Sequence, residues 1–480
     1  MSSKISSSSG LRQSGNSDHD PKTSACPLND TFPENANANS HAPMNSARPN
    51  TRSIKKQPTS QPTWIVPAHS SDLPAIRDLL ISVFQTPISA DFDAIHDNPW
   101  HDLSDRLLMK IRGEVSAHIH ITSHFIRFGR SKIQVGRIHH LVTTPERRSN
   151  GLATHLLRAA EDQINEDGAS LGMLRTQAVG FFARHGWIPC QSHLVTSASP
   201  RDVLAHLDII NIPTSHSRPL KPLTQHSIRL WRQFEQSSLM RIYQKNTSHA
   251  CGPVIRSPGY WRWLLSCDGY DRIYVAIDGP DRIHLNEDAS QIIGYAVMRN
   301  NQIIEFHTSC DNGDVERHLL SRICADAIER DDYSIELCAM ATERLHKLIL
   351  DARGTERPCK NTLMMKAFDP LAFFHQIRPE LHLRSTAASL RRPRELGLVI
   401  GNQNFRIKLT QRGARISERQ PGRSFLAIPM NDFQNLLLGQ QEVANAVRTK
   451  RWTASTRMAI QTASAIFPTC PIWSSPWDDI

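Results

Sequence analysis

One stretch in the first third of the chain constrains the fold more than any other. Residues 141–157 read Leu-Val-Thr-Thr-Pro-Glu-Arg-Arg-Ser-Asn-Gly-Leu-Ala-Thr-His-Leu-Leu: the end of an apolar strand, a basic turn, and a helix start with helical apolar spacing. The N–H groups that begin a helix lack partners within it and favour negative charge. Gly151 lets the backbone approach a ligand closely, and Arg148 can add a bidentate contact. The stretch therefore predicts a diphosphate-binding turn.

A second motif follows this turn along the chain. Gly180-Phe-Phe-Ala-Arg-His-Gly-Trp187 places an aromatic pair before a basic residue, a glycine and another aromatic residue. Either motif alone is weak, because a basic turn before a helix is common. In this order, Arg148-Ser-Asn-Gly-Leu-Ala153 and the second motif resemble the two signatures of GNAT-superfamily N-acetyltransferases. In that superfamily the arginine-x-x-glycine-x-glycine/alanine turn holds the pyrophosphate of acetyl-CoA.

The elements expected around the two motifs follow the GNAT order, and the resemblance covers roughly 64–200. Apolar periodicity and turn residues give the boundaries of these elements. The expected strands are 64–66, 105–111, 114–123, 124–129, 134–143 and 173–177, and the expected helices are 70–84, 152–166 and 180–185.

The next segment repeats the same order, which indicates an internal duplication. A long amphipathic helix is expected from Ile228 to Tyr243. Strands at 272–277, 291–299 and 302–308, a helix at 319–329 and a strand at 334–339 follow. The predicted diphosphate-binding turn at 148–153 is a cradle for a phosphate group. The corresponding turn in the second segment lacks an arginine and carries Asp311, Asp314 and Glu316, which would repel a diphosphate. We therefore expect a degenerate copy that does not bind CoA.

The whole chain divides into four expected parts. Residues 1–62 are rich in Ser, Asn, Pro and Thr and are expected to form a disordered tail. Residues 63–203 form the acetyl-CoA-binding domain, 204–366 the degenerate copy, and 367–480 a domain of short strands joined by hairpin turns. The last residues are apolar and rich in proline and tryptophan, whereas free ends are normally polar. We expect this end to be docked against the protein.

The order of these domains resembles the enhanced-intracellular-survival (Eis) family, whose last domain is similar to a sterol-carrier protein. The resemblance also rests on Arg256-Ser…Tyr-Trp-Arg-Trp263, Phe433…Leu438-Gly439 and the apolar end. It implies acetyl-CoA contacts at Leu141, Val142, Thr143, Arg148, Ser149, Asn150, Gly151, Leu152, Ala153, Thr154, Gln177 and Ala178. It also implies that the carboxylate of Ile480, the last residue, is the catalytic base.

The sequence departs from the family at the proton donor. The family has a tyrosine where Phe182 stands, and phenylalanine cannot donate a proton. Water or His185 is the expected substitute, because a CoA thiolate leaves more easily than an amine. The prediction is an N-acetyltransferase that acetylates a primary amine of a small molecule or of lysine. The alternative is a catalytically weak or inactive acyl-CoA-binding protein.

The predicted fold class is α/β (α+β): tandem GNAT-type mixed sheets flanked by helices, then a sterol-carrier-like α+β domain. No metal is expected, because His118 and His120 have strand spacing but no evident third ligand. His139 and His140 are adjacent on a predicted strand and should face opposite sides of the sheet. One of them could be a base, although ordinary packing is the favoured interpretation. Asp478 and Asp479 either bind a cationic substrate or act with Ile480, or form a solvated end.

Composition limits the compartments and partners. The nine cysteines form no C-x-x-C pair, and the N-terminus has no apolar signal region, so we expect a cytoplasmic protein with reduced thiols and no membrane span. Residues 366–480 hold 16 basic and 8 acidic residues, which raises nucleic acid or lipid as a partner. Neither is favoured, because no aromatic–basic interleaving occurs in 391–423. Hexamers occur in the resembled family, but no residue here indicates a particular homo-oligomer.

Overall fold

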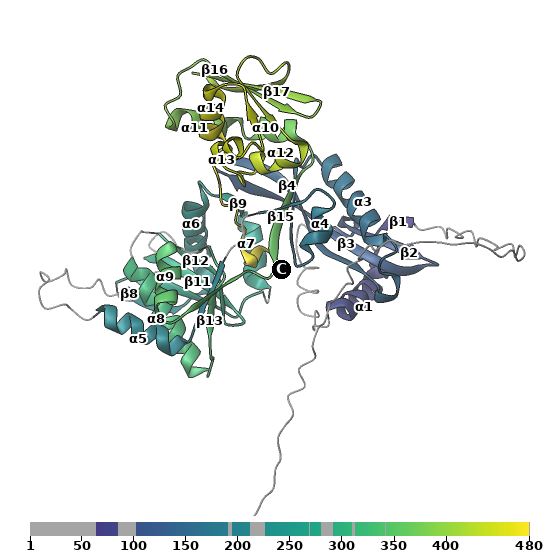
Figure 1. The fold of residues 1–480 in the computed structure, drawn as a ribbon. Helices are drawn as coiled ribbons and strands as arrows, with labels where there is room; N and C mark the ends of the chain where they lie inside the picture. The colour runs from purple at the N-terminus through teal and green to yellow at the C-terminus, as the bar shows by residue number, and fades with distance from the viewer. Residues whose placement is uncertain are drawn as a thin grey trace, which may run out of the picture. The chain divides into compact units, whose positions relative to one another are not determined.

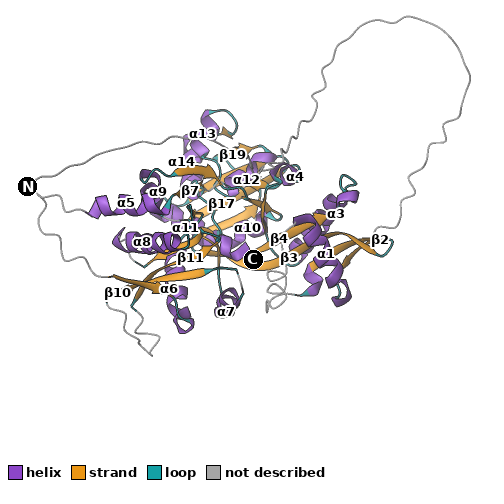
Figure 2. Cartoon of the chain, turned by 90° about the horizontal axis from the view of Figure 1, so that it is seen from below, coloured by secondary structure: helices purple, strands orange, loops and turns teal. Residues whose placement is uncertain are grey.

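A computed structural model describes residues 64–84, 102–190, 194–211, 226–267, 269–279, 291–309, 313–340 and 342–479. The expected disordered tail at 1–62 lies outside this part of the chain, as does Ile480. The described residues form three sheets with helices against them, so the predicted mixed α/β class is confirmed (Figure 2).

The first sheet carries the predicted diphosphate site. Its strand order is β1-β2-β3-β4-β5-β15-β6, and β9 pairs with β3. Figure 1 labels β1, β2, β3, β4, β9 and β15 of this sheet. The strands are β1 (Trp64–Pro67), β2 (Arg106–Ile111), β3 (Glu114–Phe128), β4 (Ser131–Thr143), β5 (Leu171–Thr176), β6 (Ile188–Pro189), β9 (Cys251–Val254) and β15 (Thr362–Ala367). The expected break between strands at 123/124 is wrong. The chain stays extended until Gly129, where a positive φ of 58° makes the turn into β4.

Helices cover both faces of this sheet. Helix α1 (Leu73–Phe84) packs on one face, with Leu108 and Val142. Helix α3 (Leu152–Glu166), which the sequence predicted with the same bounds, packs on the other face with Leu107 and Ile138. The short helix α4 (Val179–Ala183) lies on the α3 side. Since side chains alternate along a strand, β2 supplies both cores with consecutive residues.

The second sheet has the order β14-β7-β13-β12-β11-β10-β8. Its strands are β7 (Leu194–Ala198), β8 (His226–Leu230), β10 (Arg272–Asp278), β11 (Ile292–Arg299), β12 (Gln302–Thr308), β13 (Ile335–Leu337) and β14 (Thr355–Pro358). Its helices are α5 (Pro200–Asn211), α6 (Gln236–Thr247), α7 (Pro258–Ser266), α8 (Gly313–Glu329) and α9 (Glu343–Asp351). The expected helix from Ile228 is wrong at its start. Residues 226–230 are strand β8, which pairs with β10, and α6 begins only at Gln236.

The two sheets exchange one strand each. Read from β1 and from β8, the two orders match strand for strand, and the pairs β4–β5 and β12–β13 are both parallel. However, β7 lies in the second sheet between β13 and β14, and β15 lies in the first between β5 and β6. The expected boundary at 203/204 is therefore not where the sheets divide. Propensity and periodicity identify a strand, but they do not say which sheet it joins.

The third sheet has the order β18-β17-β16-β19-β20. Its strands are β16 (Arg394–Ile400), β17 (Gln403–Thr410), β18 (Gly413–Glu418), β19 (Phe425–Ile428) and β20 (Thr453–Ala454). Its helices are α10 (Pro370–Gln376), α11 (Arg378–Ala387), α12 (Met430–Leu437), α13 (Val443–Arg448) and α14 (Arg457–Ile466). Asp369 caps α10, accepting a hydrogen bond from the N–H of Ala372 at 2.9 Å. The sterol-carrier likeness of this part stays a prediction.

Short 3-10 turns complete the described chain. They are η1 (Ser70–Asp72), η2 (Leu103–Asp105), η3 (Pro145–Arg147), η4 (Gln233–Glu235) and η6 (Pro476–Asp479). No helix in the described part of the chain is long and apolar enough to cross a membrane.

Candidate active site

The predicted diphosphate turn is an open loop before helix α3. Strand β4 ends at Thr143, η3 follows, and the backbone takes left-handed conformations at Ser149 (φ 64°) and Gly151 (φ 79°). The side chains from Arg148 to Gly151 are exposed, whereas Leu152 is buried and anchors the helix. A Cβ at Gly151 would meet only His155, at 3.8 Å, so space above the turn is open. The turn therefore leaves room for an anion at the N-terminus of α3.

The N-terminus of α3 favours an anion electrically. In the described structure no side chain caps it, and its first turn carries no acidic residue. Free N–H groups and the helix dipole therefore face the open turn. The corresponding helix of the second sheet, α8, carries Asp314 and Glu316 in its first turn. The residues just before it, 310–312, with Asp311 among them, lie outside the described part.

Strands β4 and β5 part next to this turn. Their parallel register runs from Val135 opposite Leu171 to Ile138 opposite Leu174. Beyond that pair, β4 continues to Thr143 and β5 to Thr176, with no further pairing between them in the described chain. The expected contacts Leu141 to Thr143 lie on the end of β4 that still pairs with β3 but no longer with β5. Gln177 and Ala178 follow the end of β5. Both sets of expected contacts therefore lie at the parting of β4 and β5, the place beyond Ile138 and Leu174 where the two strands no longer pair.

A bulge in β4 corrects the expected orientation of its two histidines. Two residues, His140 and Leu141, oppose the single Ile119 of β3, and His140 has a φ of 50°. The ring of His139 lies 5.7 Å from that of His120, and the ring of His140 lies 6.4 Å from it. His139 and His140 therefore share one face, because the extra residue breaks the alternation of the strand.

The bulge is held by a buried pair. A guanidinium N–H of Arg106 lies 3.1 Å from Nε2 of His118, whose Nδ1 lies 3.1 Å from the carbonyl oxygen of His140. The arginine can only donate, so His118 accepts at Nε2 and donates from Nδ1. Burial, followed by the charge of Arg106, lowers the pKa of His118 well below its ordinary value. In the described chain, no three His, Cys, Asp or Glu side chains are grouped to hold a metal ion.

Phe182 and His185 lie on α4 or just after it. Phe182 is buried on the α3 side, with its ring 6.1 Å from that of Trp187. It shares a core with the partly buried Leu141, which lies on β4 beyond its pairing with β5. His185 uses Nδ1 in a 2.8 Å hydrogen bond to the carbonyl of Phe181, which leaves only Nε2 for proton exchange.

Most residues from Ile472 to Asp478, near the end of the chain, are buried. Arg256 donates to both carboxylate oxygens of Asp478, at 2.8 and 3.1 Å, and to both of Glu305, at 2.9 and 2.6 Å. Burial acts to raise the pKa of Glu305, but the attraction of Arg256 outweighs it and holds that pKa below the ordinary value. Trp477 is fully buried and packs edge-on against Trp261. Sequence reasoning singled out Arg256 only through the family resemblance.

Asp479 brings this end to the parting of β4 and β5. Its carboxylate forms ion pairs with Arg137 of β4 and Arg175 of β5, and Arg137 also donates to the carbonyl of Asp478 at 2.6 Å. Burial acts to lower the pKa of Arg137, but the pull of Asp479 outweighs it and raises that pKa. No pattern in the sequence predicts these contacts, because 341 and 342 residues separate Arg137 from Asp478 and Asp479. The expected base, Ile480, lies outside the described residues.

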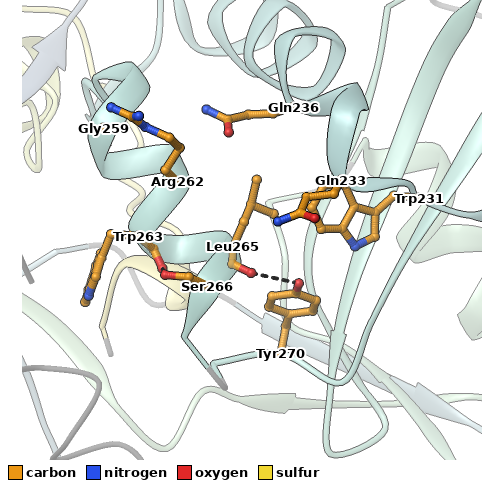
Figure 3. A pocket seen from close by; sticks show the side chains of 9 residues that line it. All are labelled: Trp231, Gln233, Gln236, Gly259, Arg262, Trp263, Leu265, Ser266 and Tyr270. Carbon is orange, nitrogen blue, oxygen red and sulfur yellow. Dashed lines mark hydrogen bonds between the residues drawn. The ribbon is translucent and has the colours of Figure 1, made fainter. Parts of the chain in front are cut away.

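A separate pocket lies beside α6 and α7 in the second sheet's unit (Figure 3). It has a volume of about 790 Å³ and is lined by Trp231, Gln233, Gln236, Gly259, Arg262, Trp263, Leu265, Ser266 and Tyr270. The hydroxyl of Tyr270 donates to the carbonyl of Leu265, and its ring lies 5.7 Å from that of Trp477. None of the expected acetyl-CoA contacts lines this pocket, so it is distinct from the turn before α3.

Comparison with known proteins decides the class of the first domain. Residues 65–190 match the family model of the acetyltransferase (GNAT) domain. Such domains transfer acyl groups and use acetyl-CoA, so this part of the chain indicates an acyltransferase at that general level. No sequence match to a curated protein was found.

Solved structures extend the likeness beyond the GNAT domain. A GCN5-related N-acetyltransferase from Anabaena variabilis is similar at 13% identity and a TM-score of 0.64, covering 86% of this chain and 99% of the other. A probable N-acyltransferase from Enterococcus faecalis is similar at 12% identity and a TM-score of 0.63, covering 86% and 97%. Eis1 from Mycobacterium abscessus is similar at 16% identity and a TM-score of 0.55, covering 86% and 99%. At these identities the likeness shows a shared fold.

Proposed function

We propose that the protein is an N-acetyltransferase that moves the acetyl group of acetyl-CoA to a primary amine, of a small molecule or of lysine. The observation that carries this proposal is the joint position of three parts. The open helix N-terminus, the parting of β4 and β5, and the anchored end of the chain all lie along β4. An acyl transfer needs an anion site for the cofactor, a gap for the thioester and a group for proton transfer.

The residues around the turn fit acetyl-CoA. The exposed turn, the absence of acidic residues in the first turn of α3 and the left-handed glycine suit a pyrophosphate. Residues 148–154 would hold that group, and residues 141–143 with Gln177 and Ala178 would hold the rest of the molecule. When bound, acetyl-CoA supplies the acetyl group as a thioester.

The base in this proposal is the carboxylate of Ile480. That residue follows Asp479, which Arg137 and Arg175 hold at the parting of the strands. Asp479 itself is already engaged in ion pairs with both arginines, so the proposal does not assign the base to its carboxylate. Deleting Ile480 should abolish turnover and leave acetyl-CoA affinity nearly unchanged. Equal turnover after the deletion would remove Ile480 from the mechanism.

The missing tyrosine at Phe182 predicts slow turnover. General acid catalysis contributes about 10²–10⁴-fold, so loss of the donor should cost part of that range. The competing function, an acyl-CoA-binding protein with weak or no turnover, rests on the same residue. Phe182→Tyr separates the two ideas, because a large gain in rate would mean that the donor's site is retained.

The decisive experiment measures release of free thiol from acetyl-CoA with a panel of small amines and lysine peptides. Thiol release that depends on the amine supports the proposal. Calorimetric binding of acetyl-CoA without thiol release would favour the acyl-CoA-binding alternative, and absence of binding would overturn both. A melting temperature raised by acetyl-CoA is the quickest first test.

A further inference from the structure

The face of the first sheet that carries the anchored end also carries a row of histidines. Strands β3 and β4 present His118, His120, His124, His139 and His140 on this face. The last two rings lie 6.2 Å apart, and the ring of Phe84 at the end of α1 lies 6.0 Å from His140. The charged side chains that face the row are Arg106 of β2, Arg137 of β4 and, through Arg137, Asp479.

Two of these histidines are joined through one hydroxyl. Oγ1 of Thr122 lies 3.1 Å from Nε2 of His139 and 3.1 Å from Nε2 of His124. A threonine hydroxyl has one proton and two lone pairs, so it can donate to one ring while it accepts from the other. The three side chains therefore form one continuous hydrogen-bonded chain. Each ring keeps its Nδ1 for a further proton exchange.

The ends of this chain lie at two different places. His139 is the first residue of β4 beyond Ile138, where pairing with β5 stops, and it lies two residues from Arg137 on the same face. His124 lies at the other end, where its ring contacts that of Tyr260 in α7 at 5.5 Å, edge to face. Both histidines are half-buried, so neither is sealed in a core. The hydrogen-bonded chain thus leads from the parting of the strands to the contact between β3 and α7.

Burial and nearby positive charge keep both rings neutral. Burial lowers the pKa of His124 to about 3, with the charge of Arg137 adding to the effect. The pKa of His139 is also lowered well below its ordinary value, first by burial and then by the positive charge of Arg137. A neutral imidazole takes a proton on one nitrogen as it releases one from the other. Such a chain passes a proton on without storing its charge beside two arginines.

We propose that His139, Thr122 and His124 carry away a proton released when the acceptor amine attacks the acetyl group. This proposal rests on the proposed function and adds a path to it. In the step, the N–C bond forms and the C–S bond breaks, and the ammonium group gives up two protons in total. One proton is taken by the base of the proposed function and ends on the CoA sulfur. The other enters at Nδ1 of His139, whose Nε2 proton passes to Thr122, and the hydroxyl proton of Thr122 passes to Nε2 of His124. His124, which is partly exposed, then releases its own Nδ1 proton to solvent, so that both rings end neutral.

In this proposal His139 is the catalytic member, because it takes the proton from the acceptor amine, and the other two residues act through it. Direct release of the proton to water at the parting would make the hydroxyl of Thr122 dispensable. The relay makes that hydroxyl essential, although it touches neither substrate. The distinguishing variant is therefore at Thr122 rather than at His139.

The test compares Thr122→Val with Thr122→Ser in the full chain. Valine keeps the branched shape that suits a strand and removes the hydroxyl, whereas serine keeps the hydroxyl. With the best amine from the panel, Thr122→Val should lower kcat at least about tenfold, within the range of general acid–base catalysis. Its acetyl-CoA affinity and melting temperature should stay close to those of the parent. Its solvent deuterium isotope effect on kcat should increase, and Thr122→Ser should restore both values.

A second variant guards against a folding defect at Thr122. His124→Gln keeps a side chain that can hydrogen-bond but cannot pass a proton from one nitrogen to another. It should show the same slow turnover and the same larger isotope effect. If the parent releases no thiol, the proposed function fails whatever these variants do. If the parent is active and Thr122→Val or His124→Gln matches it, or if Thr122→Ser is as slow as Thr122→Val, the relay is overturned.

Discussion

Asp479 joins parts of the chain that are far apart in sequence. Arg137 and Arg175 come from neighbouring strands, and their side chains are only 3% and 13% exposed at the contact. Breaking such a buried pair by removing one partner typically costs about 3–5 kcal/mol, because the other charge is left uncompensated. At the residue scale, these arginines fix where the end of the chain lies relative to the parting of β4 and β5.

Arg148 offers a direct test of the cofactor turn. Arg148→Ala should weaken acetyl-CoA binding by roughly tenfold, because one charge-assisted contact to a phosphate is worth about 1.5 kcal/mol or more. Arg147→Ala is the matched control, since it removes the same charge from the adjacent residue in η3. Calorimetry at two salt concentrations checks both variants. Equal losses for both would mean that only the general positive field matters.

The histidines of β3 and β4 predict a steep acid dependence of stability. Their folded pKa values lie below the unfolded value of 6.5, at about 3 for His124 and about 4 for His140. The native state therefore needs neutral rings, and its stability is complete above pH 6.5 and falls as pH drops below it. Between pH 6.5 and its folded pKa, each such histidine lowers the free energy of unfolding by up to about 1.4 kcal/mol per pH unit.

Urea unfolding at pH 7.5, 6 and 5 measures this loss. The unfolding free energy should fall at each step, and His140→Asn should make the fall shallower. His155→Asn serves as the control, because the His155 side chain is exposed. A free energy of unfolding that stays constant from pH 7.5 to 5 would contradict the buried, neutral state of the row.

At the scale of elements, the sequence predicts what is local. Helix α3 and strand β12 have the predicted bounds, because apolar periodicity and turn residues are carried by the segment itself. The β4 bulge, the strand β8 and the exchange of β7 and β15 were not predictable, since each depends on a distant partner. The same division holds for the site. The turn and the start of α3 could be predicted, whereas Arg137, Arg175 and Thr122 become informative only through their contacts.

Strand β9 offers a way to disturb the anchored end alone. Gly252 has a φ of 103°, and a Cβ there would lie 2.3 Å from the carbonyl oxygen of Trp473. Gly252→Ala should therefore displace the segment that leads to Asp479 and lower kcat sharply. Acetyl-CoA affinity should change little, because the turn before α3 is untouched. Turnover, calorimetry and proteolysis of the C-terminal segment measure the three effects.

Gly279→Ala is the control for that variant. Gly279 has a similar φ of 89°, but a Cβ there would meet nothing within 4 Å. It therefore carries the same backbone strain without the clash. If both variants lose turnover equally, strain rather than displacement of the C-terminal segment explains the loss.

At the scale of the whole molecule, the exchanged strands make the two related sheets depend on each other. Strand β15 follows the second copy in sequence, yet it fills the first sheet between β5 and β6. Its residues Leu363, Met364 and Met365 are all buried. Fully burying each such side chain is worth about 1.5–3 kcal/mol, so the first sheet loses a large share of its stability without this strand.

A pair of fragments tests this dependence. Residues 64–190 contain the cradle but leave an open edge on β5, so this fragment should lack a cooperative thermal transition and should aggregate. Joining residues 362–368 to its end by a short glycine-serine linker should restore cooperative unfolding, because β15 runs antiparallel to β6 beside it. Circular dichroism follows the transition, and a shift of the melting temperature by acetyl-CoA reports the cradle. Cooperative unfolding of the bare fragment with the same acetyl-CoA shift would show that the first sheet does not need the exchanged strand.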